Sequence, residues 1–373
     1  MSERAMLTPG PLVRLDIGEP DLPESDFVVL AAQAHLAAGT RYTPAAGMPA
    51  VREAVATFST KMRDTPATMS NVVMTIGANG GITTALHMLV ETYDEVLIPT
   101  PGFPVYRQSV QLLGGKPLAY HLTPRNDWQP DIDELERLAG PLTKAMILCS
   151  PSNPIGRSID QKVLAQIVAF ARRHGLVIIA DEVYDQMIFE GEPLRAYAAA
   201  PDCVIGLYSF SKNYCMTGHR IGYALLPADL VGPYVRTSAL LMSCPPSTAQ
   251  AAALAAIEGP QEDVARRTAI YRERRDAVAT AVAATGLAHW IPDGTFYFLL
   301  GLPPGTDSLR FCFDLLDRGV AASPGTAFGP AGEAGTSYLR LSLTKPIPDL
   351  LRGVEIIAAA VAELVSAEAG PVR

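Results

Sequence analysis

The chain has few lysines and no long apolar run. Only six of its 30 basic residues are lysines, and no stretch of 18 or more consecutive residues is apolar. The second absence argues against a membrane-spanning helix. The first 20 residues also lack a basic start, a following apolar run and a small-residue cleavage site, so we expect a cytoplasmic protein with no membrane partner. Because lysine is scarce, any lysine in an apolar setting is conspicuous.

Positive charge and clustered cysteines are scarce as well. The formal net charge of the 373 residues is -8 at pH 7, which leaves no broad basic surface for a nucleic acid backbone. The five cysteines lie far apart and show neither a CxxC pattern nor cysteine and histidine at metal-binding spacing. We therefore expect reduced thiols, no metal site and no nucleic acid partner.

The middle of the chain alternates short apolar runs with longer stretches of helical period. This alternation is typical of an α/β fold, and it predicts a large domain with a mainly parallel seven-stranded sheet between helices. The predicted strands cover residues 71–75, 95–99, 117–121, 145–149, 176–180, 204–208 and 221–226. Since 373 residues exceed the usual size of a single core, a second, smaller domain is expected.

The predicted domain limits follow from changes in pattern along the chain. Residues 46–275 would form the large domain, and residues 276–373 a small α+β domain whose strands lie in PDGTFYFLL and SYLRLSLT. A long helix around 265–285 would connect the two, and a helix over 347–367 would close the chain. Residues 1–45 carry many Pro and Gly and no long periodic segment, so we expect them to drape over the junction and join the small domain.

One lysine, Lys212, follows a predicted apolar strand in the segment YSFSKNYCMTGHRIGY (208–223). An amine at the end of a buried strand is partly desolvated, which favours the uncharged form that reacts with an aldehyde to give a Schiff base. Taken alone, this pattern is more often an ordinary loop lysine. Eight residues later Arg220 begins the next strand, so serine hydroxyls, the lysine and a guanidinium can converge on one phosphate group.

Polar residues also follow other predicted strands. Asp181 follows the apolar run LVIIA, where a buried carboxylate needs a partner such as a pyridinium nitrogen, or else caps the next helix. Asn153 lies in the turn SPSNPIG directly after the strand AMILC. The turn TIGANGGI (75–82) leads from a strand into a helix whose first N–H groups could bind an anion. In open α/β sheets ligands bind at the carboxyl ends of the strands, so we expect a site there.

In their order along the chain, these motifs resemble the class I/II aminotransferases, the fold-type I pyridoxal-phosphate enzymes related to aspartate aminotransferase. The resemblance covers nearly the whole chain. It is carried by LDIGEPD near the start, YTPAAGMPAVR (42–52), DEVLIPTPGFPVY (94–106), SNPIG, ADEVY, SFSK with MTGHRIGY, PDGTFYF, and PGTAFG with YLRLS. Each motif is weak alone, but so many in one order are jointly specific.

The resemblance implies a role for each matched residue around the cofactor, pyridoxal 5'-phosphate. Lys212 would form the Schiff base and move the proton of the substrate Cα, Asp181 would keep the ring nitrogen protonated, and Tyr184 would hydrogen-bond the phenolic oxygen. Phe103 would stack on the ring. The residues implied to bind the cofactor are Tyr42, Ala78, Asn79, Phe103, Asn153, Asp181, Tyr184, Ser209, Ser211, Lys212 and Arg220.

The resemblance also implies how substrate is bound and how subunits associate. Arg340 would bind the substrate α-carboxylate as a bidentate pair, with Asn153 and the backbone near Ile17 and Gly18 around the substrate. Tyr42 would reach the phosphate of the neighbouring subunit. This implies a homodimer with active sites at the subunit interface.

The implied function is transfer of an amino group from an amino acid to a 2-oxo acid. Lyases, cyclases and oxidases that act on amino acids share the same cofactor shell, so they remain the alternative. A ligand sensor of the kind found in transcription regulators would need a DNA-binding segment, which we do not expect in this acidic chain. His219 stands where relatives commonly have Trp, and it either packs behind the site or touches the substrate or the phosphate. No motif identifies the side chain of the amino acid.

Overall fold

The computed structural model describes residues 4–5, 11–329 and 337–368. Its largest element is a seven-stranded sheet in the order β2-β8-β7-β6-β5-β3-β4. The strands are β2 (Val72–Thr75), β3 (Glu95–Thr100), β4 (Lys116–His121), β5 (Thr143–Cys149), β6 (Val177–Asp181), β7 (Val204–Ser209) and β8 (Gly222–Leu225). β8 pairs antiparallel with β2 and β7, and all other neighbours are parallel. The predicted seven-stranded, mainly parallel sheet is confirmed, with strand ends within two residues.

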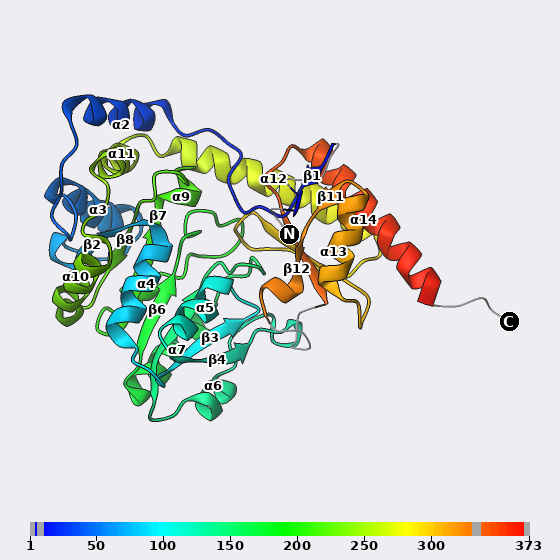
Figure 1. Ribbon diagram of the computed structural model, residues 1–373, viewed down its shortest axis with the longest axis horizontal. Helices are drawn as coiled ribbons and strands as arrows, with labels where there is room; N and C mark the ends of the chain where they lie inside the picture. Colours follow the sequence, from blue (N-terminus) through cyan, green and yellow to red (C-terminus); the bar gives the residue numbers. More distant parts are fainter. Residues whose placement is uncertain (1–3, 6–10, 330–336, 369–373) are drawn as a thin grey trace.

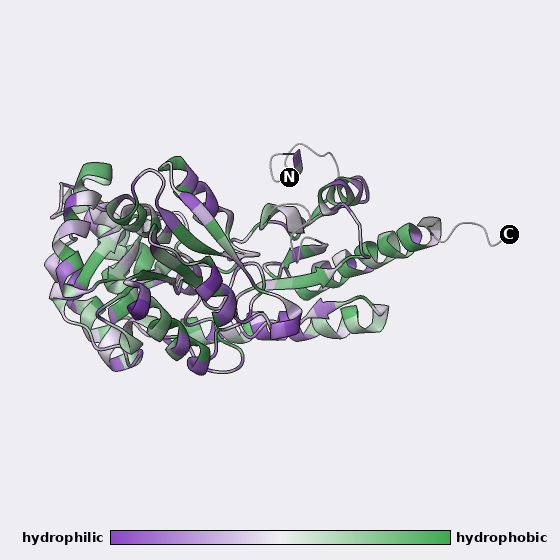
Figure 2. Ribbon diagram, turned by 90° about the horizontal axis from the view of Figure 1, so that it is seen from below, coloured by the Kyte–Doolittle hydropathy of each residue, from purple (hydrophilic) through white to green (hydrophobic). Residues whose placement is uncertain are grey.

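Both faces of this sheet are buried, as expected for a parallel sheet covered by helices. On β5, Met146 and Leu148 belong to the core on one face, whereas Ala145 and Ile147 belong to the core on the other. The helices of this lobe are α3 (Pro49–Met62), α4 (Gly77–Leu89), α5 (Pro104–Leu112), α6 (Ile132–Leu138), α7 (Gln161–His174), α8 (Ala196–Ala199), α9 (Phe210–Asn213), α10 (Ala228–Met242) and α11 (Ser247–Glu258). Figure 2 shows hydrophobic strands inside the lobe and hydrophilic stretches along its outer helices.

The second lobe is built on an antiparallel sheet of order β12-β13-β10-β9. Its elements are β9 (His289–Trp290), β10 (Tyr297–Gly301), β12 (Ser323–Pro324), β13 (Tyr338–Ser342), α13 (Ser308–Asp317) and α14 (Ile347–Glu368), and β1 (Val13–Arg14) pairs with β11 (Val320–Ala321) beside it. Helix α12 (Glu262–Thr285) runs from the large lobe to this one (Figure 1). Three short 3-10 helices complete the description: η1 (Met69–Asn71), η2 (Pro124–Asn126) and η3 (Gly325–Ala327). Within the described ranges, every helix is too short or too polar to cross a membrane.

One helix lies in a segment where the sequence indicated none. Helix α2 (Asp26–Ala38) lies in the segment that was expected to lack a long periodic element, and it packs against α11. Its sequence, DFVVLAAQAHLAA, shows no clean apolar stripe, and Leu30 and Leu36 are more than 60% exposed. Packing of Phe27 and Ala32 on the core of the large lobe stabilises the helix instead. The division of the chain at residues 45 and 275 stays a prediction.

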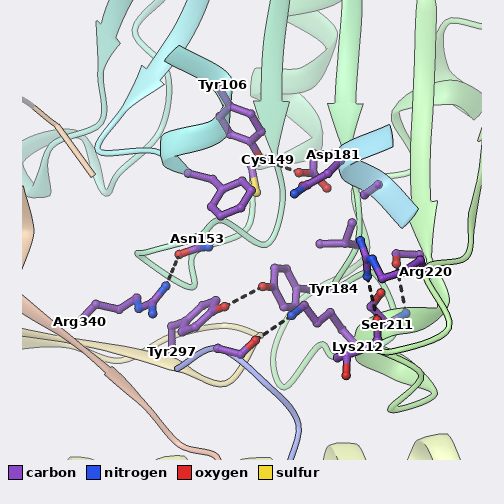
Figure 3. Close-up of a pocket in the computed structure, with 17 residues that line it drawn as sticks. Tyr106, Cys149, Asn153, Asp181, Tyr184, Ser211, Lys212, Arg220, Tyr297 and Arg340 are labelled. Carbon is purple, nitrogen blue, oxygen red and sulfur yellow. Dashed lines mark hydrogen bonds between the residues drawn. The ribbon is translucent and has the colours of Figure 1, made fainter. Parts of the chain in front are cut away.

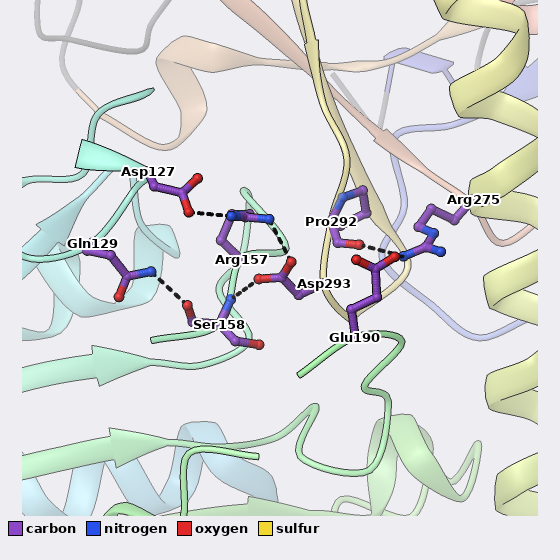
Figure 4. A network of polar contacts seen from close by, with 8 residues as sticks. All are labelled: Asp127, Gln129, Arg157, Ser158, Glu190, Arg275, Pro292 and Asp293. Carbon is purple, nitrogen blue, oxygen red and sulfur yellow. Dashed lines mark hydrogen bonds and ion pairs between the residues drawn. The ribbon is translucent and has the colours of Figure 1, made fainter. Parts of the chain in front are cut away.

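A polar network ties the β9–β10 connection to its surroundings (Figure 4). Asp293 accepts hydrogen bonds from Nη1 of Arg157 (2.6 Å) and from the backbone N–H of Ser158 (2.9 Å), both on the loop after β5. On the other side, Arg275 of α12 donates to the carbonyl of Pro292 at 3.1 Å. The connection is therefore held to both the large lobe and α12, which keeps β10 close to the loop after β5.

Candidate active site

A cavity of about 340 Å³ lies at the carboxyl ends of the central strands, where the two lobes meet (Figure 3). It brings together every residue that the sequence predicted for the site except Ile17 and Tyr42. Its walls are formed by Gly18, Ala78, Asn79, Phe103, Tyr106, Cys149, Asn153, Asp181, Val183, Tyr184, Ser209, Ser211, Lys212, Thr217, Arg220, Tyr297 and Arg340.

Asp181 is the last residue of β6, and its register partners are Cys149 on β5 and Leu207 on β7. Its Oδ2 accepts a 2.6 Å hydrogen bond from the hydroxyl of Tyr106, whereas its buried Oδ1 has no partner among the described residues. Burial raises the pKa of this carboxyl to about 6, and the Tyr106 hydrogen bond opposes that rise. The next helix begins only at Ala196, so Asp181 does not cap a helix. A buried carboxyl with one unpaired oxygen fits a protonated ring nitrogen.

The start of α4 provides the anion-binding end of the cavity. The helix begins at Gly77, so the backbone N–H groups of Ala78 and Asn79 lie in its first turn, where hydrogen-bond donors and the helix dipole attract negative charge. Gly77 has φ of +63°, and a Cβ there would lie 2.6 Å from Nη2 of Arg220. Glycine thus lets the guanidinium lie directly against the helix start. Together these groups fit a phosphate.

Lys212 lies in the single turn α9, directly after β7. Ser209 ends the strand and caps this turn, because its Oγ accepts the backbone N–H of Ser211 at 3.1 Å. The amine of Lys212 points back across the cavity and donates a 2.7 Å hydrogen bond to the carbonyl of Gly18. It also lies 5.7 Å from the centre of the Phe296 ring. The N-terminal segment therefore contacts the lysine directly.

Arg340 of β13 faces the cavity from the small lobe and is only 7% exposed. Its Nη1 donates to Oδ1 of Asn153 (3.1 Å), and its Nη2 donates to the carbonyl of Asp16 (2.7 Å) and to Oγ of Ser323 (3.1 Å). The ring of Tyr297 lies beneath it, with 4.2 Å between Cζ and the ring centre. Its Nε has no partner among the described residues. This guanidinium is held rigidly and fits a substrate carboxylate.

Several residues of the cavity wall were given no role from the sequence. Tyr106 lies one turn after Phe103, and their rings meet edge to face at 5.7 Å. Tyr297 was quoted only as part of the motif PDGTFYF, yet its hydroxyl lies 3.0 Å from that of Tyr184. The strand period could have placed Tyr297 on one face with Leu299, but it could not show which face borders the cavity.

Tyr42 and Ile17 lie outside this cavity. Tyr42 is 92% exposed and lies beside Pro245, so it does not reach the site of its own chain. Ile17 adjoins the cavity through Gly18, and its carbonyl accepts a hydrogen bond from Thr344. His219 also lies outside the cavity wall and pairs with Glu24 at 2.9 Å.

Comparison with known proteins places the chain in a family. Residues 11–357 match the family model described as aminotransferase class I and II. An LL-diaminopimelate aminotransferase of Desulforudis audaxviator is 35% identical over 351 residues, which cover 92% of this chain and 89% of the relative. An aspartate/prephenate aminotransferase of Thermus thermophilus is 32% identical over 332 residues, or 88% of this chain and 86% of the relative.

The solved structures agree. The Thermus thermophilus aspartate aminotransferase with maleate superposes with a TM-score of 0.90 and 31% sequence identity, over 96% of this chain and 94% of that one. The predicted family, fold class and enzyme class are therefore confirmed. The chain belongs to the class I and II aminotransferases.

Proposed function

We propose that this aminotransferase holds pyridoxal 5'-phosphate through Lys212 and moves an amino group from an amino acid to a 2-oxo acid. Members of its family typically depend on this cofactor. One observation carries the proposal: a single cavity holds the Lys212 amine, the unpaired Oδ1 of Asp181 and the donors around Arg220. When bound, the cofactor supplies an electron sink for the pair left on the substrate Cα after its proton is removed.

Different residues of the cavity would bind different parts of the cofactor. Asp181 would accept a hydrogen bond from the ring N–H and keep that proton in place. The Tyr184 hydroxyl and the amide of Asn153 would donate to the phenolic oxygen, because the amide oxygen of Asn153 already accepts from Arg340. Phe103 would cover one ring face. The first turn of α4 and Arg220 would bind the phosphate.

Other residues of this cavity would bind the substrate and move its proton. Lys212 would hold the cofactor covalently through its Nζ, and the same amine in its free form would take the proton from the substrate Cα. Arg340 would bind the α-carboxylate and so orient Cα toward that amine. The backbone at Gly18 contacts the lysine and would limit access of water to it.

We also propose a homodimer in which Tyr42 of each subunit completes the phosphate site of the other. Three features of the described chain support it. Tyr42 is almost fully exposed, it lies in a shallow groove with Leu36 and Pro245, and Leu36 is itself 63% exposed. Apolar side chains gathered on one face favour a subunit interface.

The decisive experiment follows the cofactor spectrum through one half-reaction at a time. An amino donor alone should shift the absorbance of the purified holoenzyme, and a 2-oxo acid added afterwards should restore it. The donor panel should include aspartate and LL-diaminopimelate, which the names of the relatives suggest. Release of ammonia without this two-step cycle would contradict transamination and favour the lyase, cyclase or oxidase alternative. The Lys212→Ala variant should show neither the absorbance of the lysine Schiff base nor turnover.

A further inference from the structure

Tyr297 connects three parts of the cavity that the proposed function uses separately (Figure 3). Its hydroxyl lies 3.0 Å from the hydroxyl of Tyr184, and its ring lies 4.2 Å beneath Cζ of Arg340. A Cβ on Gly18 would lie only 2.0 Å from the same hydroxyl, so the backbone that contacts Lys212 packs directly on Tyr297. The side chain is 2% exposed and is therefore held in one position.

The direction of the hydrogen bond between the two tyrosines has a chemical consequence. Each hydroxyl has one proton to donate. If Tyr184 donates to the phenolic oxygen of the cofactor, it must accept from Tyr297. A hydroxyl that accepts one hydrogen bond becomes a stronger donor in the next, because the bonds of a chain polarise one another. The close backbone at Gly18 leaves the Tyr297 hydroxyl no room for another partner on that side.

We propose that Tyr297 is a positioning residue for this reaction: its hydroxyl directs the Tyr184 proton toward the phenolic oxygen of the cofactor, and its ring supports the Arg340 guanidinium. The inference rests on the proposed cofactor function. It assigns two separable roles to one side chain, since the hydroxyl serves the cofactor and the ring serves the substrate carboxylate.

A spectrophotometric pH titration of the Lys212 Schiff base in the holoenzyme tests the first role. A donor to the phenolic oxygen stabilises negative charge there, most of all when the Schiff-base nitrogen has lost its proton. Tyr184→Phe should therefore raise the apparent pKa of the Schiff base. Tyr297→Phe should raise it in the same direction by a smaller amount, roughly 0.3 of a pH unit or more.

A matched control and a double variant separate this role from a general loss of packing. Tyr338→Phe removes another buried tyrosine hydroxyl of the same sheet, one without a partner among the described residues, and should leave the titration unchanged. Adding Tyr297→Phe to Tyr184→Phe should cause no further shift, because Tyr297 acts through Tyr184.

The second role is tested by the concentration of amino donor that half-saturates the enzyme. Tyr297→Phe keeps the ring and should change that concentration less than about twofold. Tyr297→Leu removes the ring below a buried guanidinium and should raise it roughly fivefold or more. The inference would be overturned if Tyr184→Phe shifted the apparent pKa of the Schiff base but Tyr297→Phe left it at the wild-type value. It would also be overturned if Tyr338→Phe shifted this pKa as much as Tyr297→Phe does. A wild type without any Schiff-base absorbance would instead refute the proposed cofactor function.

Discussion

The hydroxyl of Tyr106 donates a 2.6 Å hydrogen bond to Oδ2 of Asp181, while Oδ1 of the same carboxyl remains unpaired within the described chain. Tyr106 thus stabilises the ionised carboxylate that a protonated ring nitrogen requires. Tyr106→Phe leaves this buried oxygen without a donor, which costs about 1 to 3 kcal/mol. We expect the affinity of the apoenzyme for pyridoxal phosphate to fall about tenfold, measured by fluorescence titration.

The matched control for this experiment is Tyr120→Phe. Tyr120 is equally buried, and its hydroxyl donates to the carbonyl of Ile147 at 2.8 Å, away from the carboxyl of Asp181. Its loss should reduce stability but not cofactor affinity. An equal loss of affinity in both variants would show that the Tyr106 effect is one of packing.

The raised pKa of Asp181 predicts how the stability of the apoenzyme depends on pH. Its carboxyl has a pKa of about 6 in the folded protein and an ordinary value of 3.8, so the folded state binds the proton more tightly. The contribution of this proton to the free energy of unfolding is fully present below pH 3.8 and is lost as pH rises through about 6. Guanidinium unfolding should show wild-type stability falling by about 1 to 3 kcal/mol more than that of Asp181→Asn between pH 4.5 and 7.5. Parallel pH profiles would contradict the assignment.

Much of the site was predictable because its parts lie directly after strands. A buried run such as LVIIA ends in Asp181, and the carboxyl ends of parallel strands meet at one edge, so Asp181 and Asn153 could be placed together from order alone. Lys212 and Arg220 flank one turn between β7 and β8. Local sequence therefore determines the part of the candidate site that these four residues form.

The remaining contacts depend on packing between distant segments. Tyr106 and Asp181 are 75 residues apart, and Tyr184 and Tyr297 are 113 apart in different lobes. Such pairs depend on how the first turn of α5 lies on the sheet and on how the lobes meet, and neither leaves a periodic signal. Helix α2 was missed for a related reason, since packing against α11 rather than its own apolar stripe stabilises it.

The close approach of Gly18 to Tyr297 predicts that a single methyl group disrupts the site. A Cβ at Gly18 would lie 2.0 Å from the tyrosine hydroxyl, so the segment must move and its carbonyl would leave the Lys212 amine. We expect Gly18→Ala to lower kcat/KM at least tenfold. In Gly232→Ala the nearest atom is the flexible end of Arg236 at 3.4 Å, so that variant should keep wild-type kinetics. Unchanged kinetics in Gly18→Ala would contradict the role of this segment.

Arg340 offers a forked guanidinium, and a lysine at this position would keep the charge but lose the fork. We expect Arg340→Lys to raise KM for amino acid donors about 10- to 100-fold. Arg274→Lys, at another buried arginine that pairs with Asp21, should leave KM unchanged. The increase in KM caused by Arg340→Lys should disappear for a primary amine donor without a carboxylate. An equal increase in KM with such an amine would show that Arg340 does not act on the carboxylate.

The proposed exchange of Tyr42 between subunits makes a prediction about hybrid dimers. Lys212→Ala removes the amine of its own site, and Tyr42→Phe would impair the site of the partner. In a dimer that combines one subunit of each kind, one site then carries both defects and the other carries neither. We expect such hybrids, formed by mixing differently tagged subunits and purified by both tags, to recover about half of wild-type activity. If Tyr42 served its own chain, neither site would be intact and no recovery would occur. Chains that sediment as monomers would refute the homodimer itself.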